Sequence, residues 1–305
     1  MNILELELIN DFAQKDIEGF VAEGEKLYAQ RLENAANAII SSKKRIVLLS
    51  GPSGSGKTTS ALRIGRILEK NGFHTNVISM DNYFLPIGAD VPLGEDGRPD
   101  LESPYRMDMD LLNMQMEQIL MGASPSIPSF DFKTQSRLAG TPLKRYPDDI
   151  VIFEGIHSLN PEVTGNDDTK MGIYASVRTR LKKSDGTLLH PRLIRVLRRL
   201  CRDSLFRGRD YRETFEMLES VTRGEEKYIM PYKPRATFDL DTFIPYEIAA
   251  YRALLGNGIS LLSKDIPKNQ NCSLSAGFLE ETQPLDLSAV PKNSLIREFI
   301  GGIEL

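Results

Sequence analysis

The most specific chemical signal in this sequence is the run GPSGSGKT at residues 51–58, which matches the pattern G-x-x-x-x-G-K-[ST]. Its glycines allow main-chain conformations that are closed to residues with a Cβ atom, so that successive N–H groups converge on a bound anion. Lys57 adds a positive charge for outer phosphates, and the Thr58 hydroxyl is a typical Mg²⁺ ligand. We therefore predict a phosphate-binding loop with contacts from Gly51, Ser53, Gly54, Ser55, Gly56, Lys57, Thr58 and Thr59.

The flanking residues give this loop the setting that it requires. Residues 45–50 form a short apolar run with strand character, and a helical pattern continues from Thr59 to Lys70. A strand, the loop and a helix in that order are the context of a phosphate-binding loop. The alternative is a plain Gly/Ser-rich connecting loop, which does not require a strand before it and a helix after it.

Two carboxylates follow predicted strands. Residues 75–79 read as a strand that delivers Asp81 at its carboxyl end, where ligands bind in open α/β sheets. The apolar run 149–153 ends in Glu154, which is how P-loop proteins bring an acidic residue near Mg²⁺. An acidic residue at the end of a strand is common, so Glu154 indicates a Mg²⁺ ligand only because the chain also has the phosphate-binding loop. The alternative for Asp81 is an ordinary helix N-cap or turn aspartate.

Arginines crowd the segment that follows Pro191. So many guanidinium groups repel one another unless anions neutralise them. We favour a mobile lid at about residues 198–212 that closes over a triphosphate. The alternatives are a solvated basic face, with Asp203, Asp210 and Glu213 as partners, and an RNA-binding patch. The arginines are Arg192, Arg195, Arg198, Arg199, Arg202, Arg207, Arg209 and Arg212.

Composition narrows the class of protein. A chain of 305 residues can bury a sizeable core, and a net charge of -4 argues against a bulk nucleic-acid binder. Cys201 and Cys272 are far apart, without metal-like spacing, which favours a reducing compartment and inert thiols. The N-terminus is not a signal peptide, and no apolar run spans a bilayer. We expect a cytoplasmic protein without a membrane partner; the sequence leaves homo-oligomer formation open.

The remaining pattern alternates strands and helices, which predicts an α/β fold with a doubly wound, mostly parallel sheet. Residues 17–39 predict an amphipathic helix, with Gly24 as a point where it could break. This helix packs across the nucleotide-binding domain or, in the sharper alternative, binds a partner. Other expected elements are a long ordered loop at 85–106, helices at 108–121, from 191, 214–229 and 246–255, a hairpin or edge strand at 127–133, and strands at 171–177 and 236–243.

These segments together resemble the uridine kinase and phosphoribulokinase-like family of P-loop kinases. The matching runs lie in family order at residues 51–59, 79–84, 100–108, 130–132, 153–156 and 198–210. A closer likeness is to a bacterial branch of nucleoside or uridine kinases, which shares the runs DFKT at 131–134, EGIHSLNP at 154–161, RGEEKYI at 223–229 and PKNSLIREFIGG at 291–302. Longer members of that branch carry N-terminal domains similar to those of threonyl-tRNA synthetase. This chain lacks them, so the resemblance implies a free-standing kinase.

The resemblance implies an organisation and a set of donor-site roles. A P-loop kinase domain would span residues 43–255, between an N-terminal helical extension at 1–42 and a C-terminal extension at 256–305 that packs on the core. Asp81 would be the base that accepts the proton of the attacking hydroxyl, assisted by Lys57 and Arg202. Thr58 and Glu154, with Asp81 beside them, would hold Mg²⁺. Lid contacts to phosphate would come from Arg202, Arg207 and Arg209, of which Arg202 and Arg207 would bind ATP.

On the acceptor side, the resemblance implies contacts from Asp81, Tyr83, Glu102, Phe130, Phe132, Gln135, Arg199 and Arg209. Glu102 stands where many pyrimidine nucleoside kinases have Asp, Gln135 where they have a base-reading His, and Phe130 where Tyr is frequent. A hydrogen-bonding pocket discriminates by about 10⁴ or more, so the nucleobase preference is not inherited from the family. His157, near the site in sequence, is interpreted as structural.

The expected reaction is transfer of the γ-phosphoryl group of Mg·ATP to an alcohol, with the 5′-hydroxyl of uridine or cytidine as the favoured acceptor. One rival keeps the chemistry but uses a sugar phosphate, a pantothenate-like molecule or another small alcohol. The other rival is a regulatory or RNA-associated protein that binds ATP without an acceptor, for which a base at Asp81 has no use.

Overall fold

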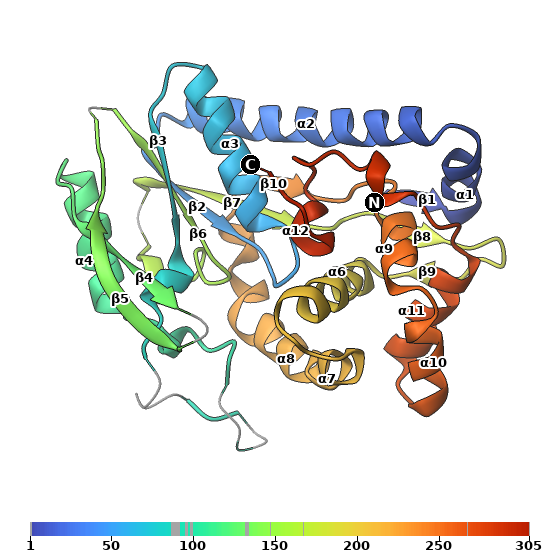
Figure 1. Ribbon diagram of the computed structural model, residues 1–305. Coiled ribbons are helices and arrows are strands. Elements are labelled where there is room, and N and C mark those ends of the chain that lie inside the picture. Colours follow the sequence, from blue (N-terminus) through green and yellow to red (C-terminus); the bar gives the residue numbers. More distant parts are fainter. Residues whose placement is uncertain are drawn as a thin grey trace.

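The computed structural model in Figure 1 describes residues 2–86, 92–94, 97, 100–131, 134–146, 148–166, 168–266 and 268–304. Among these residues the central sheet has five strands, all parallel, in the order β10-β7-β2-β6-β3. Their bounds are β2 Ile46–Ser50, β3 Thr75–Ser79, β6 Ile150–Glu154, β7 Lys170–Ser176 and β10 Phe238–Asp241. Because the strands are parallel, their carboxyl ends meet at one edge of the sheet.

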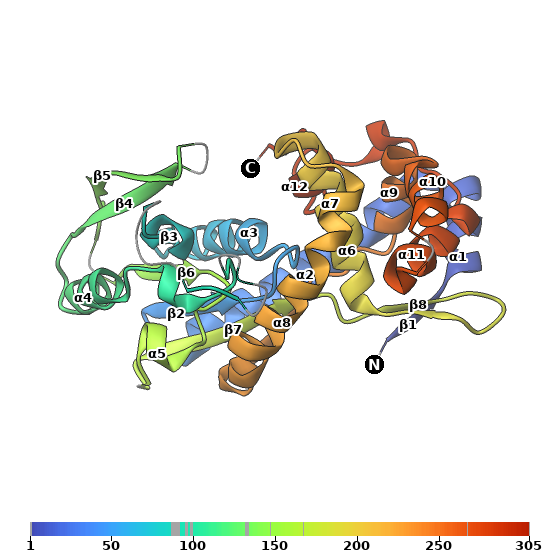
Figure 2. The same cartoon turned by 90° about the horizontal axis from the view of Figure 1, so that it is seen from below.

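Both faces of this sheet are buried, as expected for a doubly wound fold. One face packs against helices α2 (Ile17–Ser42) and α3 (Lys57–Lys70) in a core that also contains α6 (Pro191–Phe206) and α9 (Glu247–Leu255). The other face packs against α4 (Met109–Leu120) and α5 (Pro161–Thr164). Figure 2 shows α3 and α5 on opposite sides of the strands.

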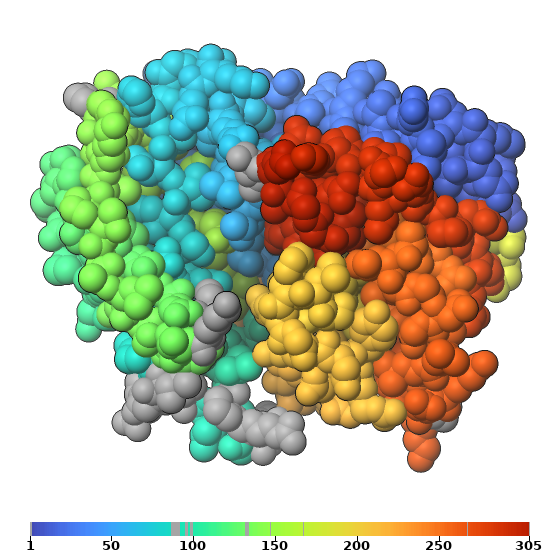
Figure 3. Space-filling view, in the orientation of Figure 1, coloured from blue at the N-terminus to red at the C-terminus, as the bar shows by residue number. Residues whose placement is uncertain are grey.

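The remaining elements surround the carboxyl edge of the sheet and the far end of α2. The short helix η1 follows β3, and η2 lies in the long loop before α4. Figure 3 shows the surface hollowed between the half that holds α3 and the β4–β5 hairpin and the half that holds α6, α7 and the C-terminal segment. The bounds are η1 Met80–Tyr83, η2 Pro104–Arg106, β4 Ser126–Asp131, β5 Ser136–Pro142, α7 Tyr211–Glu216, α8 Leu218–Tyr228 and η3 Met230–Arg235.

Several elements near the chain ends were not foreseen. A small sheet pairs β1 with β8 and β8 with β9, so residues near the N-terminus lie beside the middle of the chain. Residues 256–290, which carry no clear sequence pattern, contain helices. The bounds are β1 Ile3–Glu5, α1 Leu6–Lys15, β8 Arg180–Lys182, β9 Leu188–Leu189, α10 Gly258–Asp265, α11 Gln270–Glu281, η4 Leu287–Ala289 and α12 Arg297–Ile300.

Helix α2 corrects the expected break at Gly24, because it runs unbroken for 26 residues. Gly24 instead allows close packing: a Cβ atom there would lie 2.9 Å from Cδ1 of the Tyr246 ring. Tyr28, Leu32 and Ile39 of α2 are fully buried in the core of the main sheet. The apolar stripe of α2 therefore packs across the sheet, and the boundary at residue 42 stays a prediction. No helix in the described ranges has the length and apolar character to cross a bilayer.

Candidate active site

The phosphate loop, residues 51–58, connects β2 to α3, and its glycines are needed for its shape. Gly54 and Gly56 have φ angles of +75° and +78°, a left-handed conformation that L side chains rarely adopt. A Cβ atom on Gly51 would lie 2.2 Å from the carbonyl oxygen of Ala175 in β7. The loop therefore lies tightly against the end of the neighbouring strand, with the N-terminus of α3 directly after it.

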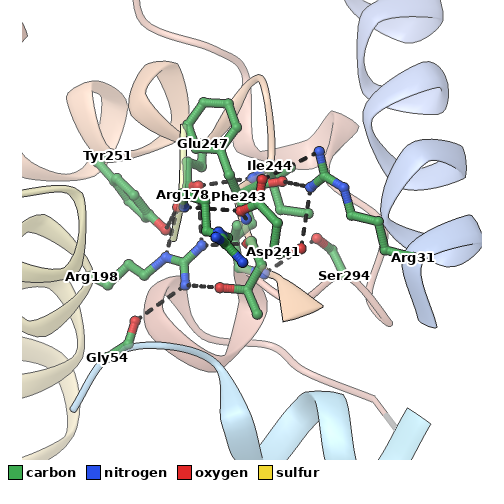
Figure 4. A network of polar contacts seen from close by, with 12 residues as sticks. Arg31, Gly54, Arg178, Arg198, Asp241, Phe243, Ile244, Glu247, Tyr251 and Ser294 are labelled. Carbon is green, nitrogen blue, oxygen red and sulfur yellow. Dashed lines mark hydrogen bonds and ion pairs between the residues drawn. The ribbon is translucent and has the colours of Figure 1, made fainter. Parts of the chain in front are cut away.

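Two arginines of α6 donate hydrogen bonds to main-chain carbonyls of the phosphate loop. Arg195 donates to the Ser53 carbonyl at 3.2 Å. Figure 4 shows the second contact, in which Arg198 donates to the Gly54 carbonyl at 3.2 Å. Arg198 is fully buried and pairs with Glu247, with an Nε to Oε2 distance of 2.7 Å. Burial alone would lower the pKa of Arg198, but the carboxylate of Glu247 raises it above its usual value. Arg198 thus belongs to the core, which corrects its place at the start of the expected mobile lid.

Glu154 lies at the centre of the site because of the sheet register. It pairs with Leu49 of β2 on one side and with Ser79 of β3 on the other. Its side chain is 2% exposed, and burial raises its pKa; Lys57 opposes this rise, whereas Asp81 adds to it. The side chains of Ser79 and Thr58 are close enough to oppose the rise in the pKa of Glu154 as well.

These neighbours fit a divalent cation. The Oε2 atom of Glu154 is buried without a hydrogen-bond partner in the described part of the chain. A buried carboxylate oxygen in that state costs free energy unless a cation or donor reaches it. Mg²⁺ is typically bound by one or two carboxylates together with substrate phosphates, and the exposed Thr58 adds a hydroxyl oxygen. The donor set at Thr58 and Glu154, with Asp81 beside it, is therefore suited to Mg²⁺.

Asp81 lies on η1, two residues beyond the end of β3. Its carboxylate is close enough to Glu154, Arg106 and Arg207 to change the pKa of each. Asp81 is half-buried rather than enclosed in the core. The structure thus brings Asp81, Glu154, Lys57 and Thr58 together, as the sequence predicted for these four residues.

The arginines around the end of α6 share one carboxylate. Asp203 is fully buried and lies 2.8 Å from Arg202, 3.6 Å from Arg207 and 3.9 Å from Arg209. Burial lowers the pKa of Arg207, and Arg202 lowers it further, because a single Asp203 does not balance the group. The cluster therefore keeps an excess of positive charge next to Asp81, which suits phosphate groups.

Two of the residues expected to bind the acceptor, Glu102 and Arg199, lie near each other, and Glu102 is also near Lys57. Burial raises the pKa of Glu102, against the opposing effect of Arg199 and Lys57. Burial also lowers the pKa of Arg199 to about 10, and Glu102 opposes this shift. Phe130 meets Phe84 edge to face, with ring centroids 5.7 Å apart.

Three other residues expected to bind the acceptor are found in a turn, outside the described residues or in the core. Gln135 forms the turn between β4 and β5 with a φ angle of +51°. Phe132 lies outside the described residues. Tyr83 is fully buried and donates to Oε1 of Gln115 at 2.7 Å. Its hydroxyl is thus used within the core, and a contact between Tyr83 and an acceptor stays a prediction.

Sequence reasoning missed two residues that reach the site. Arg106 lies 4.8 Å from the Phe84 ring centroid and is electrostatically coupled to Asp81 and Glu102. Glu298 of α12 accepts a hydrogen bond of 2.5 Å from Thr59. The run at 291–302, shared with the bacterial branch, was the signal for Glu298. Arg106 falls inside the matching run at 100–108 but had no distinguishing pattern of its own.

A cavity of about 550 Å³ lies beside the phosphate loop, between the ends of β7 and β10 and the start of α6. It includes Pro52 and Arg195 but not Lys57, Asp81 or Glu154. This cavity therefore does not coincide with the convergent polar groups, and the candidate site is defined by those groups.

Comparisons with known proteins match the part of the chain that contains these residues. The phosphoribulokinase / uridine kinase family profile matches residues 46–243, a range that contains the phosphate loop, both carboxylates and the arginine cluster. A uridine kinase of Halobacterium salinarum is 30% identical over 198 residues, which cover 65% of this chain and 78% of that protein. A uridine kinase of Staphylococcus aureus is 29% identical over 201 residues, or 66% of this chain and 86% of its own.

A solved structure assigned as a fructose transport system kinase of Silicibacter sp. covers 68% of this chain and 98% of its own, with 17% identity and a TM-score of 0.47. That likeness is too loose to carry an argument. The family match covers well over half of the chain, including the phosphate loop, Asp81, Glu154 and the arginine cluster around Asp203. The chain therefore belongs to the phosphoribulokinase / uridine kinase family.

Proposed function

We propose that this protein transfers the γ-phosphoryl group of Mg·ATP to the 5′-hydroxyl of a nucleoside such as uridine or cytidine. The observation that carries this proposal is the buried Glu154, with Lys57, Thr58 and Asp81 around it. A protein that only bound ATP would need the loop and the cation ligands but not a carboxylate at Asp81. The two uridine kinases named above support a nucleoside as the acceptor class.

In the proposed reaction the main-chain N–H groups of the phosphate loop and Lys57 hold the donor phosphates. The acceptor oxygen forms a bond to the γ-phosphorus while the bond from that phosphorus to the β–γ bridging oxygen breaks, so that ADP leaves. Asp81 accepts the proton of the attacking hydroxyl. Arg202, Arg207 and Arg209 neutralise negative charge that develops on the transferred group, because Asp203 leaves them with an excess of positive charge.

Thr58 and Glu154 would hold Mg²⁺, with Asp81 beside them. When bound, the ion would neutralise charge on the β- and γ-phosphates. Lys57 would offset the negative charge that remains on these phosphates. It lies close enough to Glu154 to oppose the rise in the pKa of that carboxylate.

The acceptor would lie between Asp81 and Glu102. Glu102 and Arg199 are close enough for each to shift the pKa of the other, and Oε2 of Glu102 has no hydrogen-bond partner among the described residues. Such a pair can accept from and donate to the two hydroxyls of a ribose. Phe84 and Phe130 supply apolar surface for a flat base.

The test is a product screen. The protein is incubated with Mg·ATP and a panel of nucleosides, sugar phosphates and small alcohols, and the phosphorylated product is identified by mass. We expect a nucleoside 5′-monophosphate. ATP binding without any phosphorylated product across the panel would contradict the proposal.

A second candidate acceptor, a sugar phosphate, is favoured by one observation. Arg106 lies against Phe84 near Asp81 and could bind a phosphate on the acceptor. We rank it second because Asp81, Glu102 and Asp100 already surround Arg106 with negative charge. A sugar bisphosphate as the product of the same screen would reverse this ranking.

A further inference from the structure

Helix α8 carries the residues RGEEKY of the run at 223–229, and the proposed chemistry assigns no role to this run. On one side this helix is linked to the phosphate loop through Arg195 of α6, and on the other side it contacts the loop that carries Glu102. Residues of the three segments meet in the described structure although they lie far apart in sequence.

On the donor side the link runs through a buried ion pair. Glu225 accepts two hydrogen bonds from Nη2 of Arg195, at 2.8 and 2.9 Å, and both side chains are less than a tenth exposed. The other terminal nitrogen of Arg195 donates to the Ser53 carbonyl at 3.2 Å. Glu225 thereby fixes the guanidinium that holds the phosphate loop.

On the acceptor side the link is a close approach and a hydrogen bond. A Cβ atom on Gly224 would lie 2.3 Å from Cβ of Glu102 and 2.7 Å from its Cγ. The hydroxyl of Tyr228 donates to Oδ2 of Asp100 at 3.0 Å, and Oδ1 of Asp100 accepts from the Glu102 N–H at 3.1 Å. Glu102 thus packs against Gly224 of α8, and Asp100 of its own loop accepts a hydrogen bond from its backbone N–H.

Helix stability alone does not account for Gly224. Glycine in a helix interior is less favourable than alanine, so local propensity would select against it. Its use at this position allows the backbone of α8 to touch the Glu102 side chain. His157 completes the junction, with its ring centroid 6.2 Å from that of Tyr228.

We propose that Gly224, Glu225 and Tyr228 are positioning residues that set the distance and angle between the donor phosphates and an acceptor bound at Glu102. This inference rests on the proposed function. The residues do not touch the reacting atoms; they act through Arg195, Asp100 and Glu102. A loss of alignment should therefore change KM and kcat in a pattern that depends on which side is disturbed.

The acceptor side is tested with Gly224→Ala and its matched control Gly277→Ala. Gly277 also lies inside a helix, but the nearest atom to its added Cβ would be the flexible Nζ of Lys183 at 3.4 Å. Because displacement of about 1 Å can cost about a hundredfold in rate, we expect Gly224→Ala to raise the acceptor KM or lower kcat by at least about tenfold. The donor KM should change less than about twofold, as should every parameter of Gly277→Ala.

The donor side is tested with Glu225→Gln and its neighbour Glu226→Gln. Glu226 also pairs with an α6 arginine, Arg192, at 3.3 Å, but that pair is exposed. We expect Glu225→Gln to raise the Mg·ATP KM at least about fivefold, whereas an exposed pair contributes little and Glu226→Gln should act like the wild type. Equal effects of the two variants would overturn the donor-side link.

The acceptor KM of a second variant and hydrogen exchange test the same link without relying on the activity of Gly224→Ala. Tyr228→Phe removes only the hydroxyl that binds Asp100, so it should raise the acceptor KM even if Gly224→Ala does not fold. Hydrogen exchange at residues 100–106 should speed up in both variants, and this readout does not need turnover. Unchanged exchange there overturns the inference whatever the activity. An inactive wild type with faster exchange in the variants overturns the proposed function alone.

Discussion

Oγ1 of Thr59 donates a hydrogen bond of 2.5 Å to Oε2 of Glu298, across 239 residues of chain. Thr59 lies in the first turn of α3, where the helix N-terminus attracts anions. Beside it, Leu295 covers Gly56: a Cβ atom on that glycine would lie 2.6 Å from Cδ1 of Leu295. The C-terminal segment therefore packs on the phosphate loop and places a carboxylate next to the proposed donor site.

Removal of this negative charge should favour donor binding. Glu298→Gln keeps an oxygen that can accept from Thr59 but removes a charge from the end of α3. A charge at a helix terminus contributes about 0.3 to 1 kcal/mol, so the KM for Mg·ATP should fall about two- to fivefold. The control Glu304→Gln changes an exposed C-terminal carboxylate paired with Lys292. A higher KM in Glu298→Gln than in this control would contradict the expectation.

The Arg198–Glu247 pair should be essential for stability. Both side chains are fully buried, and Arg198→Met leaves the Glu247 carboxylate without its cation. Removal of one partner of a buried pair typically costs about 3 to 5 kcal/mol in free energy of unfolding. The double variant Arg198→Met/Glu247→Gln should regain part of this loss in urea denaturation. A double variant that is less stable than the single one would show that uncompensated charge is not the cause.

Glu154 should reduce the stability of the protein without Mg²⁺ at neutral and higher pH. Burial raises its pKa, so its stabilising contribution is present below the unfolded pKa and is lost as pH rises through the folded value. Without metal, Glu154→Gln should therefore be more stable than the wild type at pH 8, and the difference should shrink towards pH 4. Urea denaturation in EDTA measures this difference. Added Mg·ATP should then stabilise the wild type more than the variant.

His157 should make stability fall on acidification. Burial lowers its pKa to about 4, while nearby backbone groups of Glu102 and Tyr228 oppose the shift. A folded pKa below the unfolded value of about 6.5 means that stability is full above pH 6.5 and is lost as pH falls towards 4. The loss is up to roughly 3 kcal/mol for a shift of this size. His157→Gln should show a correspondingly flatter pH profile of unfolding, whereas parallel profiles would exclude this role.

The sequence predicted the parts of the site that depend on local pattern. Local periodicity or composition predicts each of three features: the phosphate loop, the strand ends at Ser79 and Glu154, and the helix that begins at Pro191. Parallel strand order then brings Asp81, Glu154 and Lys57 together without further information. The family match confirms the kinase family that these motifs indicated.

What the sequence could not predict depends on contacts between distant segments. Arg198 and Arg202 look alike in a run of arginines, yet one pairs with buried Glu247 and the other with Asp203 near the site. Tyr83 lies beside Asp81 in sequence, but its hydroxyl reaches Gln115 on α4. The contact of Glu298 with Thr59 joins segments that no local pattern relates.

The central claim is that Asp81 removes a proton from an acceptor alcohol held opposite the donor phosphates. Its most direct test is the rate of product formation by Asp81→Asn, with Mg·ATP binding measured on the same preparation. A general base contributes about 10² to 10⁴ in rate, so kcat should fall by that factor while the affinity for Mg·ATP changes less than about twofold. An Asp81→Asn variant that forms the phosphorylated product at close to the wild-type rate would contradict the account.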